Sequence, residues 1–229
     1  MINLMKILFF FFLFHSCGLL EEKQETFEGS YYIVEGWSAF VNEDYQLAES
    51  SFLDAMQSGD VRDSILSNIG LGITSFYWAN SKINNQSDST LKIEELRNFA
   101  SIKLADSESQ YNNNSFSEFI FNEIDFEPIF LLSMVLKYNY DAFSNSRSYF
   151  EEGLDYEYYE NMLLSSEKTL QYSDKLIDYE DFIFNYDAKV DIETIYLVRA
   201  QTYLRIAEYG SAQSEYLKFG SAECLDDSG

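Results

Sequence analysis

The amino-acid sequence predicts an all-α fold, and three observations lead to this prediction. Proline occurs once and glycine ten times in 229 residues, so most of the turn residues that an all-β fold needs are missing. Small and aromatic residues recur at steps of three and four, which is the spacing of one helix face. Hydrophobic residues make up 46% of the chain, which is enough apolar surface for a packed core.

The first element of the chain has the pattern of a leader. Lys6 is followed by eight apolar residues, 7–14, and then by His-Ser-Cys-Gly at 15–18. One cation, a short apolar run and a small residue are typical of an export signal. The run is shorter than the roughly 20 apolar residues that a membrane-spanning helix requires. We therefore predict a signal peptide over 1–16, with a buried N-terminal helix as the alternative.

The cysteine that ends this leader resembles a known modification site. Ser16-Cys17-Gly18 resembles the lipobox of bacterial lipoproteins, in which a small residue precedes the cysteine. The resemblance implies lipidation of Cys17 by a diacylglyceryl thioether, usually with a third acyl chain on its amine. Two or more chains anchor a protein firmly, because each buried methylene contributes about 0.8 kcal/mol. Because Gly18 is not aspartate, the resemblance favours an outer membrane lipoprotein of the bacterial cell envelope, facing the periplasm or the cell surface.

Charge and residue chemistry exclude several classes of function. The 39 acidic and 15 basic residues give a net charge of −24, which repels phosphate backbones, so we expect no nucleic-acid partner. His15 is the only histidine, and Cys224 would be the only thiol left beside an acylated Cys17. Loss of the leader would therefore remove imidazole-based catalysis and His or Cys metal sites. We expect no cofactor, no metal and no enzyme, although hydrolysis by a carboxylate pair stays open.

Polar stretches divide the rest of the chain. The acidic segment 17–28 is predicted to be a tether, 29–221 the folded domain and 222–229 a disordered tail. Asparagine- and serine-rich stretches predict three loops inside the domain, at 80–89, 112–115 and 144–146.

One residue pattern occurs at both ends of the domain. The steps of three and four within each copy place its residues on helix faces, and a step of six in the middle leaves room for a tight turn. Each copy is therefore predicted to be a helix-turn-helix. The copies are Tyr32, Gly36, Ala39, Tyr45, Ala48, Phe52 and Ala55, and Tyr196, Ala200, Tyr203, Tyr209, Ala212, Tyr216 and Phe219.

A partial third copy and two further helices fill the region between. Leu71-Gly72 and Phe76 repeat the first copy at an offset of 36 residues. Its second helix is predicted within 91–110, with Ala100, Leu104 and Ser107 at the expected steps. The pattern fades further on, where helices are predicted at about 128–143 and 157–177, the first beginning at the single proline.

These copies resemble the tetratricopeptide repeat, a helix-turn-helix unit of about 34 residues. The resemblance implies a tetratricopeptide-like solenoid with an irregular helical centre, and a generic helical bundle is the alternative. In such a solenoid the first helix of each pair lines a concave face, which is the usual binding surface.

The positions that would line this concave face are mostly apolar. An apolar groove in water costs about 25 cal/mol per Å², so either a partner's apolar or amphipathic segment or the chain's own centre is expected to cover it. Trp37, Phe40, Phe76 and Tyr77 are the candidate partner-binding residues in the first case and ordinary core in the second. The remaining positions are Ile33, Val41, Ile69, Ile73, Leu197, Gln201, Leu204 and Arg205.

A second candidate is the acidic, tyrosine-rich stretch 155–160. Its rings and carboxylates would stack on sugars or hold cationic groups, or else form a helix with the rings turned inward. The sequence as a whole predicts a lipid-anchored, non-catalytic scaffold for a protein partner with an apolar or basic segment. The alternative is a lipoprotein that captures sugars or peptides.

Overall fold

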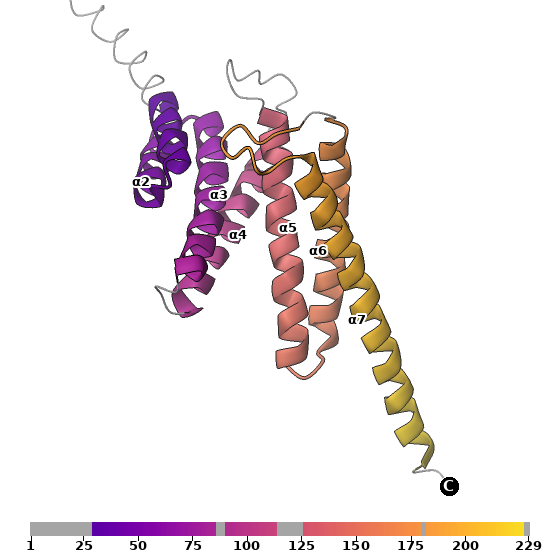
Figure 1. The fold of residues 1–229 in the computed structure, drawn as a ribbon. Coiled ribbons are helices and arrows are strands. Elements are labelled where there is room, and N and C mark those ends of the chain that lie inside the picture. The colour runs from indigo at the N-terminus through magenta and orange to yellow at the C-terminus, as the bar shows by residue number, and fades with distance from the viewer. Residues whose placement is uncertain (1–28, 86–89, 114–125, 180–181, 227–229) are drawn as a thin grey trace, which may run out of the picture. The chain divides into compact units, whose positions relative to one another are not determined.

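The computed structural model describes residues 29–85, 90–113, 126–179 and 182–226 (Figure 1). Regular secondary structure in these ranges is helical, apart from one isolated antiparallel bridge between Ile183 and Asp191. The all-α prediction is therefore confirmed. The predicted signal peptide, Cys17 and the tether lie outside the described residues. The chain divides into two compact units, 1–116 and 117–229.

The first unit consists of helices that pack on their neighbours in the chain. A helix over 29–41 is followed by α2 (Tyr45–Met56), α3 (Val61–Asn85) and α4 (Thr90–Asn113). α2 packs on α3, and α3 packs on α4. α3 continues through 80–85, where the sequence predicted a loop, and 86–89 lies outside the described residues. The predicted loop at 112–115 is likewise helical at 112–113 and outside the described residues beyond that.

The turn predicted in the N-terminal copy is confirmed. Asn42 Nδ2 donates to the Ser38 carbonyl at 2.8 Å, and Glu43 adopts a left-handed conformation with φ 60°. The Asp44 carboxylate then accepts a hydrogen bond from the Leu47 N–H at 3.2 Å and begins α2 as its N-cap. Three polar residues thus reverse the chain between two helices.

The core of the first unit is built around Phe52 of α2. Its ring lies against Gly36 of the first helix and Gly70 of α3, at distances that leave no room for a side chain on either glycine. The Trp37 ring meets it edge-on, with ring centroids 5.2 Å apart. Gly36 and Gly70 therefore allow the three helices to pack closely around this ring.

α4 is the second helix that the sequence expected for the partial third copy. Ala100, Leu104 and Ser107 are its buried residues, as the steps predicted. The Leu104 side chain lies so close to Gly72 of α3 that a Cβ there would overlap it. This pairing of α3 with α4 confirms a second helical hairpin.

The second unit contains α5 (Phe126–Glu151), α6 (Tyr156–Ile177) and α7 (Ile192–Asp226). α5 packs on α6, and α7 packs on both. The two helices predicted in the centre are therefore confirmed. The loop predicted at 144–146 is wrong, because these residues lie inside α5. Asn145 Nδ2 donates to the Asp141 carbonyl and Ser146 Oγ to the Phe143 carbonyl, so their polar groups are satisfied within the helix.

The turn predicted inside the C-terminal copy is also wrong. α7 is one continuous helix of 35 residues, and it extends beyond the turn between α5 and α6 (Figure 1). The six-residue step contains Leu204, Arg205, Ile206, Ala207 and Glu208, all of which are compatible with a helix interior. It lacks the Asn-Glu-Asp sequence that reverses the first copy. Equal spacing of apolar residues therefore did not mean an equal fold.

None of the described helices combines the length and apolar character needed to cross a bilayer.

Candidate interaction surface

α7 has apolar residues on two opposite sides. Ile195 and Thr202 are buried against the rest of the second unit, and Tyr209 packs there as well. On the other side lie Tyr196, Leu197, Ala200, Tyr203 and Leu204, which we call the outer face of α7. The four large side chains of the outer face are between 53% and 58% exposed. A helix that is apolar on both sides is typical of a buried element, so this exposure is unusual.

The spacing of the outer face makes it one continuous stripe. Tyr196 and Tyr203 are seven residues apart, as are Leu197 and Leu204, and Ala200 lies between the two pairs. Seven residues are close to two helical turns, so each pair lies nearly in line along the helix. The result is two rows of large apolar side chains separated by a small residue.

Polar contacts fix the rotation of α7 on its neighbours. The Arg199 guanidinium donates to Ser173 Oγ at 3.2 Å and forms an ion pair with Asp174 of α6. The Arg205 guanidinium donates twice to Asn139 Oδ1 of α5, at 3.3 Å each. Near the end of the contact the Tyr209 ring lies 5.0 Å from that of Phe150. These contacts turn the outer face away from α5 and α6.

The same contacts set the charge around the outer face. Both arginines within 192–210 are engaged with α5 or α6, and burial lowers the pKa of Arg205. The Arg199 guanidinium also lies over the Tyr203 ring, 6.0 Å from its centroid. Glu193 and Glu208 are exposed at the two ends of the stripe, because Glu193 lies seven residues before Ala200 and Glu208 lies four residues after Leu204. A carboxylate therefore lies at each end of the outer face.

The four residues predicted to bind a partner lie together in the first unit. Trp37 and Phe40 are buried and Phe76 is almost completely buried, whereas Tyr77 is half-buried. The Phe40 ring meets that of Trp37 at 5.7 Å and that of Tyr77 at 4.9 Å, both edge-on. Trp37, Phe40 and Tyr77 form an aromatic cluster with Phe52. This burial favours the second of the two predicted alternatives, in which these residues are core.

The tyrosine-rich stretch at 155–160 forms the beginning of α6. Asp155 caps the helix by accepting a hydrogen bond from the Glu157 N–H at 2.9 Å. The half-buried Tyr159 ring lies 5.9 Å from that of Tyr149 in α5, and Tyr156 is exposed beside it. Asp155 of the stretch thus has a helix-capping role, and Tyr159 packs against α5.

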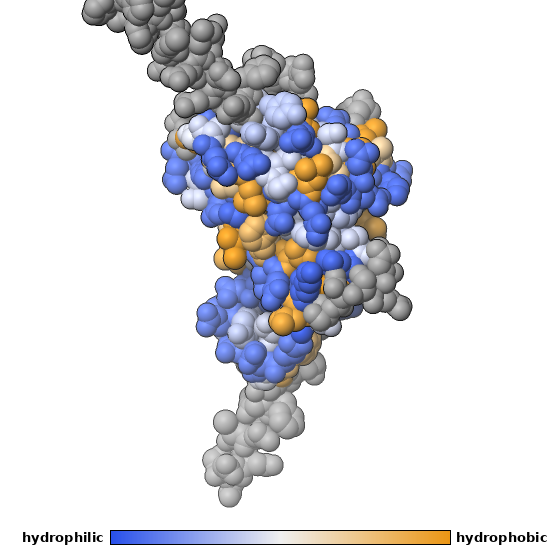
Figure 2. All heavy atoms as spheres, turned by 90° about the vertical axis from the view of Figure 1, so that its left-hand side faces the viewer, coloured by the Kyte–Doolittle hydropathy of each residue, from blue (hydrophilic) through white to orange (hydrophobic). Residues whose placement is uncertain are grey.

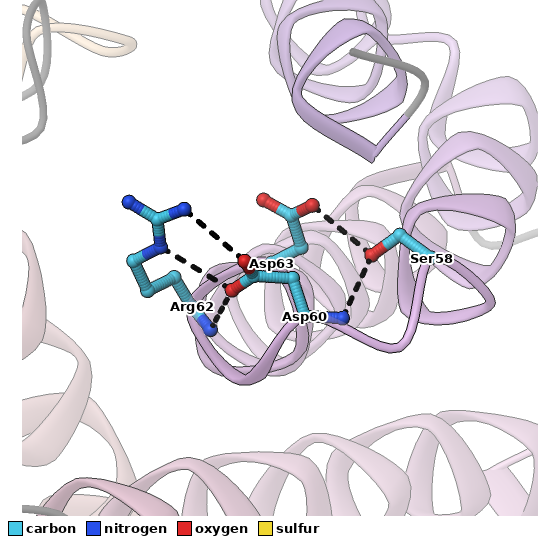
Figure 3. Close-up of polar contacts among 4 residues, drawn as sticks. All are labelled: Ser58, Asp60, Arg62 and Asp63. Atoms are coloured by element: carbon cyan, nitrogen blue, oxygen red, sulfur yellow. Dashed lines mark hydrogen bonds and ion pairs between the residues drawn. The ribbon is translucent and has the colours of Figure 1, made fainter. Parts of the chain in front are cut away.

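A compact polar cluster stands at the start of α3 (Figure 3). The Asp60 carboxylate accepts from the Arg62 N–H at 2.7 Å and pairs with its guanidinium at 3.1 Å. The hydrogen bond from the Arg62 side chain holds the pKa of Asp60 below its usual value. Ser58 Oγ donates to the Asp63 carboxylate at 3.0 Å and accepts from the Asp60 N–H at 3.3 Å. Helix capping accounts for these contacts.

Asp63 is the buried carboxylate of this cluster. Only 6% of the residue is exposed, and a side chain on Gly29 would overlap its carboxylate. Burial raises the pKa of Asp63, and the hydrogen bond from Ser58 only partly offsets this. No pattern in the sequence points to Asp63, because its burial depends on the approach of Gly29 from another helix.

The remaining surface features provide weaker evidence for a functional site. No group of three or more His, Cys, Asp or Glu side chains suited to holding a metal ion occurs among the described residues. On the face drawn in Figure 2, hydrophilic residues separate the hydrophobic ones into small patches. Scattered exposed apolar residues are normal in proteins, so the ordered stripe on α7 is the feature that requires explanation.

The sequence named part of this surface but not its role. Leu197 and Leu204 were expected beside the packing positions, and they are exposed. Tyr196, Ala200 and Tyr203 were expected to be packing positions themselves, which would have needed a second helix after a turn. Because α7 does not turn back, they are at the surface too. Comparisons of the chain with protein-family models, curated proteins and solved structures found no match.

Proposed function

We propose that this protein is a lipid-anchored scaffold of the bacterial cell envelope that binds another protein without catalysis. The observation that carries the proposal is the outer face of α7, an ordered apolar stripe that is more than half exposed at each large residue. Such a stripe in water is unfavourable by about 25 cal/mol per Å² of apolar area, and a bound partner would remove that cost. The resemblance of 16–18 to a lipobox supports the anchor.

The all-helical construction agrees with this role. Helical hairpins in sequence present long, rigid faces, and such faces are common protein-binding surfaces. The proposal assigns the partner contact to α7 and not to Trp37, Phe40 or Phe76, because those side chains are already packed inside the first unit. Tyr77 belongs to the same aromatic cluster.

Two measurements test the two halves of this proposal. Cys17→Ser should abolish incorporation of radiolabelled fatty acid and release the protein from envelope membranes, and continued labelling would remove the anchor from the proposal. Chemical crosslinking in intact envelopes should recover a protein partner with the wild type and not with Leu197→Glu/Leu204→Glu. Equal recovery with the double variant would show that α7 is not the binding element.

A further inference from the structure

The repeat pattern itself shows how the outer face of α7 would be covered. In the N-terminal copy, Gly36 and Ala39 are buried, and α2 inserts Phe52 against Gly36. Ala200 and Tyr203 occupy the matching positions of the C-terminal copy and are exposed. In the N-terminal copy a helix packs on this arrangement of small and aromatic residues. In the C-terminal copy none of the described helices packs on it. The occupant that fits the outer face is therefore an α-helix with apolar side chains along one side.

Charge decides which helix fits. The whole chain carries a net charge of −24, and the exposed carboxylates of Glu193 and Glu208 border the stripe. The charge of Arg199 is paired with Asp174 of α6, and the Arg205 guanidinium is bonded to Asn139 of α5, so neither arginine is paired with these carboxylates. A second copy of this chain would bring like charges together, and an anionic lipid surface would be repelled in the same way.

We propose that the outer face of α7 binds a cationic amphipathic helix of a partner protein, with the partner's apolar side on the stripe and its lysines or arginines beside Glu193 and Glu208. This inference rests on the proposed scaffold function and names the chemistry of its partner. Residues 192–210 of α7, which include the outer face and both carboxylates, correspond to about 28 Å of helix, so a partner segment of about five turns would lie along them.

A pair of synthetic peptides provides the probe. Each is about 18 residues long, to match the five turns estimated above, and carries the same leucine and alanine stripe. One has lysine at the other positions and the other has glutamate. Fluorescence anisotropy of the labelled peptides, titrated with the purified full chain, measures binding. We expect the lysine peptide to bind at least about tenfold more tightly than the glutamate peptide.

Variants separate docking from general attraction to an acidic protein. Leu197→Glu/Leu204→Glu adds two negative charges, so unspecific attraction predicts equal or tighter binding of the lysine peptide, whereas docking predicts a loss of at least about tenfold. Leu91→Glu/Ile102→Glu is the matched control, because both of its residues are exposed to a similar degree on α4. It should leave binding within about twofold. Leu197→Ala/Leu204→Ala removes apolar area without adding charge and should also weaken binding.

The border carboxylates have their own variant. Glu193→Gln/Glu208→Gln should weaken binding of the lysine peptide and make that binding less dependent on salt concentration. Circular dichroism should show unchanged helix content. Equal binding of the two peptides would overturn the inference, as would unchanged or tighter binding in Leu197→Glu/Leu204→Glu. Self-association in sedimentation velocity that this double variant abolishes would assign the face to a second copy and overturn it as well.

These results are distinguishable from failure of the scaffold function. If no peptide binds but a crosslinked partner still depends on Leu197 and Leu204, the cationic helix is wrong and the scaffold stands. If the lysine peptide binds α7 but Cys17→Ser leaves fatty-acid labelling intact, the anchor is wrong and the inference about α7 stands.

Discussion

The ring of Phe52 lies so close to Gly36 that a Cβ at this glycine would stand 2.7 Å from the ring's Cε1 atom. Real side chains do not approach so closely, so the first helix and α2 have been brought together by the absence of a side chain at position 36. The same ring lies 2.5 Å from the Cβ position of Gly70 in α3. Phe52 thus fixes the spacing of three helices at once, and the first prediction follows from this.

Gly36→Ala should destabilise the first unit by about 1–3 kcal/mol, because the added methyl group forces the Phe52 ring out of its packed position. Urea unfolding followed by circular dichroism measures the change. Gly210→Ala is the matched control, since the nearest atom to its Cβ is the Tyr159 hydroxyl at an ordinary 3.8 Å. It should stabilise α7 by about 0.5–1 kcal/mol through helix propensity. A Gly36→Ala protein as stable as wild type would contradict the packing described here.

Asp44→Ala should destabilise the first hairpin by about 1 kcal/mol, because the Leu47 N–H at the start of α2 loses its acceptor. Asp44→Asn retains an acceptor oxygen of equal capping strength, so its stability should stay close to that of the wild type. Thermal unfolding of the three proteins separates the loss of the cap from the loss of charge. If the asparagine variant lost as much thermal stability as the alanine variant, the loss of charge and not of capping would be responsible.

Asp63→Asn should change how stability depends on pH. The folded state raises the pKa of Asp63 above its ordinary value of 3.8, so the folded protein binds the proton more tightly than the unfolded chain does. Stability then decreases as pH rises from about 3.8 through the folded pKa, by about 1.4 kcal/mol for each unit between the two values. The asparagine variant lacks this decrease and can still accept the hydrogen bond from Ser58.

The measurement is urea unfolding of both proteins between pH 4.5 and 7. The stability of Asp63→Asn relative to wild type should increase across that range. The pKa of Asp60 is lowered below its ordinary value of 3.8, so this carboxylate stays ionised throughout the range in both proteins. A difference that stayed constant or shrank towards neutral pH would refute the raised pKa.

Asp141→Ala should cost more stability than Lys137→Met. Lys137 Nζ lies 2.9 Å from the Asp141 carboxylate and 3.8 Å from the Tyr138 ring centroid, and the lysine is buried. Asp141→Ala leaves a buried ammonium without its counter-ion, which should lower the free energy of unfolding by about 3–5 kcal/mol. Lys137→Met introduces an apolar side chain of similar length and should lower it by about 1.5 kcal/mol or less. Equal losses in chemical denaturation would show that the pair is effectively solvated.

Much of the fold could be predicted from local residue patterns. Ala100, Leu104 and Ser107 were placed on the buried side of α4 because burial of one helix side imposes steps of three and four. The turn between the first helix and α2 was also predictable from the step of six residues after Ala39. The structure shows that Asn42, Glu43 and Asp44 form this turn. In both cases the information lies within a few residues of the feature.

The errors arose where a pattern has two physical solutions. Ser144, Asn145 and Ser146 read as a loop, yet two of their side chains bond back to helix carbonyls and let α5 continue. The step from Tyr203 to Tyr209 read as a turn by analogy with the first copy, yet its residues have no cap and favour helix. The exposure of Tyr196, Ala200 and Tyr203 was not predicted for the same reason, since it depends on whether the chain turns back after Tyr203.

The helices of each unit pack mainly on the helices next to them in the sequence: α2 on α3, α3 on α4, α5 on α6 and α6 on α7. Each such pairing closes only a short length of chain, and proteins dominated by local pairings fold on the order of microseconds to milliseconds. Neither unit has to wait for the other end of the polypeptide to be synthesised or delivered. A chain that is synthesised N-terminus first would therefore acquire its hairpins one after another, in the order in which they appear.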